Sequence, residues 1–135
     1  MNQEPFDFSI QDLNPKFLFS CLVERNTEEK NYHSHDFIEL AIIMKGSSLF
    51  CINGINYTVS TGDLILLNPG TLHKSVPVIT PNSTCCLECY MGFTEIEYRD
   101  CIKNTLPLFH GQNQILHMND KLKHDVFQLC LAVHK

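Results

Sequence analysis

Residues 33–39 of this chain read His-Ser-His-Asp-Phe-Ile-Glu, and residues 62–73 read Gly-Asp-Leu-Ile-Leu-Leu-Asn-Pro-Gly-Thr-Leu-His. Side chains alternate along a β-strand, so an extended first segment would place His33, His35 and Glu39 on one face. The same face would continue with Phe37, Ala41 and Ile43. His73 ends the second segment and would join the other two histidines if the sheet closes into a barrel. The two segments therefore predict a polar site inside a closed β-structure.

The composition is that of one globular domain. The chain has 135 residues, of which 44% are hydrophobic and 19% charged, with a net charge of −5. This charge and the lack of a Lys/Arg cluster argue against direct nucleic-acid binding. No apolar run approaches the roughly 18 residues of a membrane span, so we expect no membrane contact.

The seven cysteines are expected to be free thiols. The N-terminus has neither the basic nor the apolar region of an export signal, which predicts a reducing, cytoplasmic location. Cys85, Cys86 and Cys89 could suggest zinc or redox chemistry. They lie in an apolar run with no second cysteine pair nearby, however, which favours buried thiols.

A series of short strands separated by turn residues predicts a β-sandwich or barrel. The charged residues 24–30 are interpreted as a solvated turn, and residues 95–103 as a short helical turn. Asn53-Gly54 predicts a type I′ hairpin, because both residues tolerate a positive φ. The predicted strands cover residues 17–23, 36–45, 48–52, 55–60, 64–67, 72–78 and 85–93, with a short strand or edge segment at 114–118.

Residues 119–135 change to a helical pattern. Asn119 or Asp120 can cap the helix. An apolar seam follows at the spacings that favour a partner helix, and it consists of Leu122, Val126, Leu129 and Val133. Because no helix stop signal precedes Lys135, we expect a fragment that ends within or just after its first long helix. The alternative is a chain that ends on a helix packed against its own barrel. The predicted organisation is an arm over 1–16, a barrel over 17–118 and a helix over 119–135.

Two readings of the polar site remain open. Three imidazoles and one carboxylate suit a divalent ion such as Zn, Fe, Mn or Ni. On a straight strand Glu39 would lie about 13 Å from His35, so a shared metal requires a bent or bulged strand. The alternative is a polar pocket wall that hydrogen-bonds a small molecule without any metal.

The two segments resemble the motifs of the cupin superfamily. His33, His35, Glu39 and Gly46 keep the spacing of the first motif, with Thr27 in place of its leading glycine. In the second motif Gly62 and His73 keep their separation, whereas the proline comes one residue late at Pro69 and Pro77 replaces the asparagine. The resemblance implies a mainly β fold, the double-stranded β-helix or jelly-roll barrel, followed here by the C-terminal α-helix. It also implies a metal-ligand set of His33, His35, Glu39 and His73.

The finer pattern of residues 33–73 is similar to the N-terminal effector-binding and dimerisation domain of AraC-family transcription regulators. The resemblance extends over roughly residues 17–135. It implies a small-molecule pocket that an N-terminal arm can cover, a dimer contact through the C-terminal helix, and DNA binding by a domain beyond residue 135. The family often keeps the fold without needing a metal, so no cofactor is required. The expected pocket residues are His33, His35, Phe37, Glu39, Phe50, Tyr57 and His73, with Ala41, Ile43 and Ile52 as further wall or core residues.

Three functions are compatible with these features. We expect an effector-sensing, homodimerising domain of a bacterial AraC-type regulator that reaches DNA only through another domain. The alternative is a metal-dependent cupin enzyme, such as a dioxygenase or isomerase, although the sequence singles out no catalytic acid, base or nucleophile beyond the ligand set. A purely structural dimer-forming barrel is the third.

Overall fold

The computed structural model describes residues 16–94 and 114–134 of this chain. All of the predicted arm except Lys16, and the helical turn predicted over 95–103, lie outside the described residues. The described elements are β1 (Phe17–Arg25), β2 (Ile38–Lys45), β3 (Ser47–Ile52), β4 (Ile55–Ser60), β5 (Asp63–Leu67), β6 (His73–Pro77), β7 (Cys86–Phe93), β8 (Gln114–His117) and α2 (Asp120–His134).

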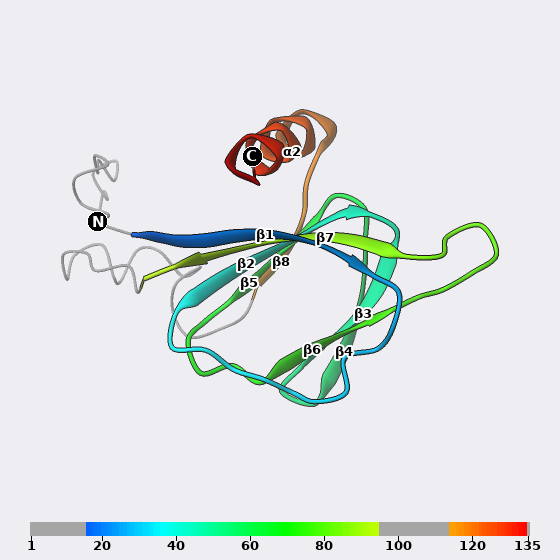
Figure 1. The fold of residues 1–135 in the computed structure, drawn as a ribbon, viewed down its shortest axis with the longest axis horizontal. Coiled ribbons are helices and arrows are strands. Elements are labelled where there is room, and N and C mark those ends of the chain that lie inside the picture. Colours follow the sequence, from blue (N-terminus) through cyan, green and yellow to red (C-terminus); the bar gives the residue numbers. More distant parts are fainter. Residues whose placement is uncertain (1–15, 95–113, 135) are drawn as a thin grey trace, which may run out of the picture.

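The strands form two antiparallel sheets that enclose a lumen. The larger sheet has the order β1-β7-β2-β5-β8 and the smaller sheet the order β4-β3-β6. Figure 1 views the barrel with the larger sheet above and the smaller sheet below. The helix α2 lies over the outer face of the larger sheet, where it contacts β1. The predicted mainly β barrel with a C-terminal helix is confirmed.

The strand positions follow the local sequence signals closely. At the predicted hairpin Asn53 has φ 49° and Gly54 φ 82°, and the flanking residues Ile52 and Ile55 pair. These are the two positive φ values of a type I′ turn. Two boundaries differ from the prediction by two residues, and the others by no more than one. β1 continues through Arg25, into the segment interpreted as a solvated turn, and β2 begins at Ile38 instead of residue 36.

The central strands of the larger sheet are buried on both faces. Facing the lumen, β2 and β7 belong to an apolar cluster that also includes residues of the smaller sheet, such as Phe50 and Val59. Facing α2, the same strands contribute Ile42, Cys89 and Met91 to a second cluster that includes Cys130 of the helix. The six cysteines of the described residues are free, and Cys86 and Cys89 are buried as predicted, whereas Cys85 is only half-buried.

The helix α2 begins where the sequence indicates. The Asn119 side-chain oxygen accepts a hydrogen bond from the Leu122 backbone N–H at 2.9 Å, so Asn119 is the N-cap. Val126 packs against the barrel, whereas Leu122, Leu129 and Val133 remain 39%, 54% and 41% exposed. Three of the four predicted seam residues therefore remain exposed, and Val126 packs against the chain's own core. Within residues 16–94 and 114–134, no helix is long and apolar enough to cross a membrane.

Candidate functional site

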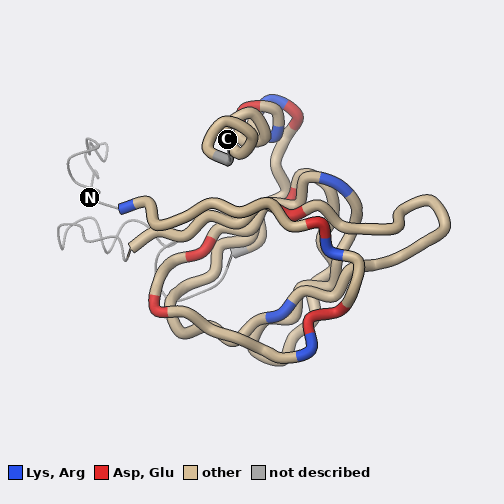
Figure 2. The backbone as a smooth tube through the Cα atoms, viewed as in Figure 1, with Lys and Arg blue, Asp and Glu red and all other residues tan. Residues whose placement is uncertain are grey.

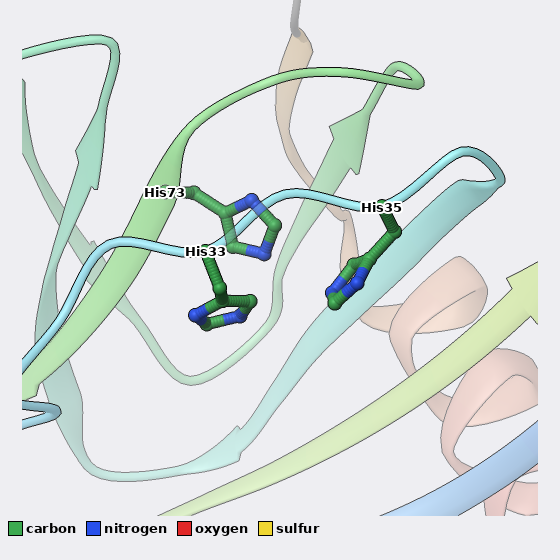
Figure 3. Close-up of side chains that lie close together, drawn as sticks. All are labelled: His33, His35 and His73. Carbon is green, nitrogen blue, oxygen red and sulfur yellow. The ribbon is translucent and has the colours of Figure 1, made fainter.

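His33, His35 and His73 converge at one end of the lumen (Figure 3). Each offers a ligand atom, and these atoms lie within 4.8 Å of one another. The ring centroids are 4.2 Å apart for His33 and His73, 5.1 Å for His33 and His35, and 5.4 Å for His35 and His73. The sequence-predicted histidines are thus brought together from the segment before β2 and from β6.

The backbone fixes this arrangement through an irregular segment. His33 and His73 exchange two backbone hydrogen bonds, of 3.0 and 2.9 Å, and His35 accepts a third from Gly70 at 2.7 Å. A shared site required a bent or bulged chain between His35 and Glu39, and the chain does bend between His35 and Ile38. That bend, not a bulge within a strand, brings Glu39 to His35.

Glu39 lies at the start of β2 and contacts two of the three imidazoles. Its carboxylate oxygens are 3.1 Å from Nε2 of His35 and 3.5 Å from Nε2 of His73. Glu39 is only 4% exposed. It is not part of the tight group of ligand atoms formed by the histidines. The arrangement is therefore three imidazoles supported by an acid, where the sequence suggested four equivalent ligands.

His73 is the most deeply buried member of the cluster, at 2% exposure. Its Nδ1 is 2.9 Å from the Thr71 carbonyl oxygen, to which it donates as Nδ1–H. Its Nε2 is buried and lacks a hydrogen-bond partner of good geometry. Burial alone would lower the pKa of His73, but Glu39 and the bond to Thr71 raise it above its ordinary value. For His33, burial and the neighbouring His73 lower the pKa.

A pocket of about 230 Å³ extends from the histidines into the lumen. Its wall combines imidazoles and carboxylates at one end with Arg25 and Tyr90 at the other, and alternate residues of β1 form one side. The lining residues are Phe19, Cys21, Val23, Arg25, Glu29, His33, His35, Glu39 and Tyr90. An outer groove of about 700 Å³ is lined by Ser34, His35, Asp36, Phe37, Pro69 and Gly70. His35 borders both spaces, and its ring stacks on Phe37 with centroids 4.6 Å apart.

Four of the seven predicted pocket residues do not line the inner pocket. Phe37 lines the outer groove, and His73 contacts His33, His35 and Glu39 of the wall without lining the space itself. Phe50 is fully buried in the core, with its ring parallel to that of His73 at a centroid distance of 6.4 Å. Tyr57 is 38% exposed and lines neither space. β4 is an edge strand whose residues from Ile55 to Thr58 are exposed, and it contributes a buried side chain to the core further along, at Val59. Ala41, Ile43 and Ile52 are core residues.

Three ionisable residues of this region were not anticipated from the sequence, namely Arg25, Glu29 and Glu88. Glu88 is fully buried, and its carboxylate accepts hydrogen bonds from Arg25 Nε and Ser75 Oγ, both at 2.6 Å. Arg25 lies on the same face of β1 as Phe19 and Val23, so the alternation of β1 was the available signal. The charged residues 24–30 were interpreted as a solvated turn, so Arg25 was not assigned to the strand. Figure 2 shows acidic and basic residues interspersed along this part of the backbone.

The comparisons with known proteins agree with this geometry. Residues 18–133 match the family model described as the AraC-like ligand binding domain. Among solved structures, apo ToxT K231A from Vibrio cholerae strain SCE256 aligns with a TM-score of 0.60 at 12% identity, covering 86% of this chain and 47% of ToxT. Wild-type ToxT bound to an unsaturated fatty acid aligns with a TM-score of 0.53 at 14% identity, covering 88% of this chain and 46% of ToxT.

Other similar structures are cupins, among them an RmlC-like cupin from Shewanella frigidimarina NCIMB 400, with a TM-score of 0.47 at 15% identity over 74% of this chain and 96% of that chain. No curated protein matches the chain. The chain spans about half the length of ToxT.

Proposed function

This chain belongs to the family of AraC-like ligand binding domains, and we propose that its histidine-lined pocket binds the small-molecule effector of a bacterial transcription regulator. The observation that carries the proposal is a lumen pocket lined by imidazoles, carboxylates and a guanidinium. A core serving stability alone would be filled with apolar groups, because burying ionisable groups costs free energy. The family is one of ligand-binding domains, so the alternative of a cupin enzyme is set aside.

The pocket limits the kind of effector. Its volume of about 230 Å³ is below the roughly 300–1,000 Å³ typical of drug-sized ligands. Its polar groups demand hydrogen-bonding partners, because an unpaired buried polar group is costly. ToxT has been seen with an unsaturated fatty acid. We propose a smaller and more polar effector here.

A thermal-shift screen of small polar compounds tests this proposal. A compound that binds the folded state raises the unfolding temperature, by the equivalent of about 2.7 kcal/mol at a hundred times its Kd. Val23→Phe would fill the pocket from β1 and should abolish the shift. Ile55→Phe, at a site 57% exposed on β4, is the matched control and should retain it. Stabilisation that survives in Val23→Phe would place binding outside the pocket.

A divalent metal at the histidines is a second component of the proposal. Support comes from His73, whose buried Nε2 has no hydrogen-bond partner of good geometry, with Glu39 3.5 Å away, while Nδ1 is held by Thr71. Holding a histidine by its other nitrogen is the usual arrangement around a bound metal. His33, His35 and His73 would be the ligands and Glu39 their acidic neighbour; Zn, Fe, Mn and Ni all suit this set. A bound ion would supply positive charge and an electron-pair acceptor at one end of the pocket.

Metal binding is tested by titrating chelator-treated protein with zinc and measuring heat and stoichiometry. We expect stoichiometric binding that His73→Asn removes. His117→Asn is the control, since His117 is an exposed histidine that contacts Asp63 outside the cluster. No saturable binding of zinc, nickel or cobalt would contradict the metal site and leave an effector pocket without metal.

The exposed apolar stripe of α2 supports a homodimer. Leu122, Leu129 and Val133 recur at spacings of seven and four residues, so they lie on one face of the helix, and all three are exposed. A second copy of this helix offers a matching stripe. We propose that this dimer positions DNA-binding domains lying outside the chain, in a cytoplasmic regulator. The strands β1, β2 and β7 lie between the pocket and α2. A displacement of pocket residues can therefore be transmitted through these strands to the dimer contact.

A further inference from the structure

We propose that Glu29 is the positioning residue of His33, holding it with the proton on Nδ1 so that Nε2 is free to bind a ligand or metal. This inference rests on the proposed function, because it concerns the same cluster. Glu29 lies outside the histidine and glutamate motifs, in the connection between β1 and β2. Its carboxylate oxygen Oε2 is 3.5 Å from Nδ1 of His33.

Glu29 is itself held firmly in place. Its backbone N–H donates to the Ser75 carbonyl oxygen at 3.2 Å, and its Oε1 accepts a hydrogen bond from the Ser75 backbone N–H at 2.8 Å. Nη1 of Arg25 lies 3.8 Å from the same oxygen. Ser75 is two residues after His73 on β6. The connection and the strand that carries His73 are thus joined at Glu29, which directs its second oxygen to His33.

The neighbouring acid Glu28 provides a contrast. Its side chain is 58% exposed, and it pairs with Lys74 Nζ at 3.2 Å on the outside of the barrel. The two adjacent glutamates therefore have opposite placements. Of these two residues, Glu29 lines the pocket and Glu28 does not.

Each histidine of the cluster then has its own acceptor. His33 contacts Glu29, His35 contacts Glu39, and His73 donates to the Thr71 carbonyl. A carboxylate accepts hydrogen bonds and donates none, so it selects the imidazole tautomer that carries a proton on the facing nitrogen. Such partners of ligand histidines commonly contribute 10- to 100-fold to metal affinity.

Glu29→Gln separates positioning from packing, because it keeps the size of the side chain. The amide oxygen can still accept from the Ser75 N–H. The amide NH₂ then faces Nδ1 of His33 and donates to it, which moves the imidazole proton to Nε2. Glu28→Gln removes the same charge at the adjacent residue and is the matched control.

The direct test is histidine-selective NMR of the metal-free protein at mildly alkaline pH, where the tautomer of a neutral ring can be assigned. We expect Nδ1–H for His33 in the wild type and in Glu28→Gln, and Nε2–H in Glu29→Gln. A His33 tautomer that is the same in all three proteins overturns the inference. This readout needs no bound metal or effector, so it is independent of the proposed function.

Binding supplies the second readout. With zinc, measured by competition with a chelator, we expect Glu29→Gln to bind roughly 10- to 100-fold more weakly and Glu28→Gln to match the wild type. With cobalt, the visible absorption spectrum of Glu29→Gln should change. In a His33→Ala background, Glu29→Gln should cause no further loss, because the two residues act as one unit.

The outcomes separate the two proposals. A wild type that binds no metal contradicts the metal site, while the tautomer measurement still decides the role of Glu29. A wild type that binds metal with an affinity unchanged in Glu29→Gln overturns the positioning role alone. Thermal unfolding of each metal-free variant checks that the fold is retained.

Discussion

The two faces of strands β2 and β7 differ sharply in chemistry. Toward α2, these strands present Leu40, Ile42, Cys89 and Met91, which pack with Cys130 of the helix. Toward the lumen, the same strands add buried Glu39, Glu88 and Tyr90 to their apolar residues. Successive residues of one strand alternate between the two faces, so both environments arise from a single stretch of sequence.

The difference shows how one sheet can serve stability and recognition together. The helix-covered face gains free energy from apolar burial, about 25 cal/mol per Å² removed from water. The lumen face holds charges whose desolvation is offset only by close pairing, as between Glu88 and Arg25. Substitutions on the helix-covered face should therefore change the stability of the fold alone. Substitutions on the lumen face should change both stability and ligand affinity.

The largest expected effect comes from breaking the buried ion pair. Arg25→Ala leaves the carboxylate of Glu88 buried without its cation, which should lower the free energy of unfolding by about 3–5 kcal/mol. Urea denaturation at neutral pH measures it. The double variant Arg25→Met with Glu88→Leu should recover most of the loss, since both charges are then replaced by apolar groups. A loss below about 1 kcal/mol in Arg25→Ala would show that Glu88 is not held as a buried charge.

On the helix-covered face, Ile42→Ala should cost about 2–4 kcal/mol through lost burial and the cavity left behind. Ile42 is 1% exposed, and its face does not line the pocket. The affinity for any compound found in the screen should therefore stay unchanged in the folded variant. A loss of affinity comparable to that caused by pocket variants would mean that the two faces are not separable.

A smaller effect concerns pH. Because Glu39 helps to raise the pKa of His73, His73 stabilises the fold fully below its unfolded pKa of 6.5 and loses this contribution as pH rises through its higher folded pKa. His33, whose pKa is lowered, contributes in the opposite direction, stabilising above 6.5 and losing stability as pH falls through its folded pKa. In the metal-free protein, Glu39→Gln should therefore reduce the decrease in the free energy of unfolding that occurs above pH 6.5. The free energy of unfolding would be measured by urea denaturation at several pH values across neutrality. The same pH dependence in the wild type and in Glu39→Gln would contradict this prediction.

The smallest effect on the folded barrel is expected at the exposed stripe of α2. Leu129→Glu should change stability by no more than about 0.5 kcal/mol, because Leu129 is 54% exposed. It should nevertheless abolish dimerisation, as measured by sedimentation velocity. Gln128→Glu introduces the same charge at the adjacent exposed position and should leave the dimer intact. A wild-type chain that remains monomeric at high concentration would count against a dimer formed by α2 alone.

Much of this fold was predictable from local patterns. The hairpin at Asn53-Gly54 and the cap at Asn119 depend on neighbouring residues alone, and both are confirmed. The convergence of His33, His35 and His73 followed from motif spacing. Arg25 and Glu88 lie 63 residues apart in sequence, and their pairing depends on β1 lying beside β7. The sequence around either residue does not indicate which strands will be neighbours. The charged residues 24–30, moreover, indicated a solvent-exposed turn.

The errors have related causes. Tyr57 was expected in the pocket wall, yet it lies on the exposed part of the edge strand β4, where it is 38% exposed. Periodicity placed Val126 in a seam for a partner helix, but it packs on the chain's own barrel. In both cases the local period is right, and the tertiary surroundings decide which face is covered.

The central claim is that ligands bind on the lumen face, at the three histidines. Histidine-selective NMR tests it most directly, with each ring assigned by single substitutions and the metal-free protein titrated with zinc or with a compound found in the screen. We expect the ring signals of His33, His35 and His73 to shift stoichiometrically with added ligand, while those of His117 and His124 stay unchanged. Saturable binding that leaves the three cluster rings unchanged would contradict it.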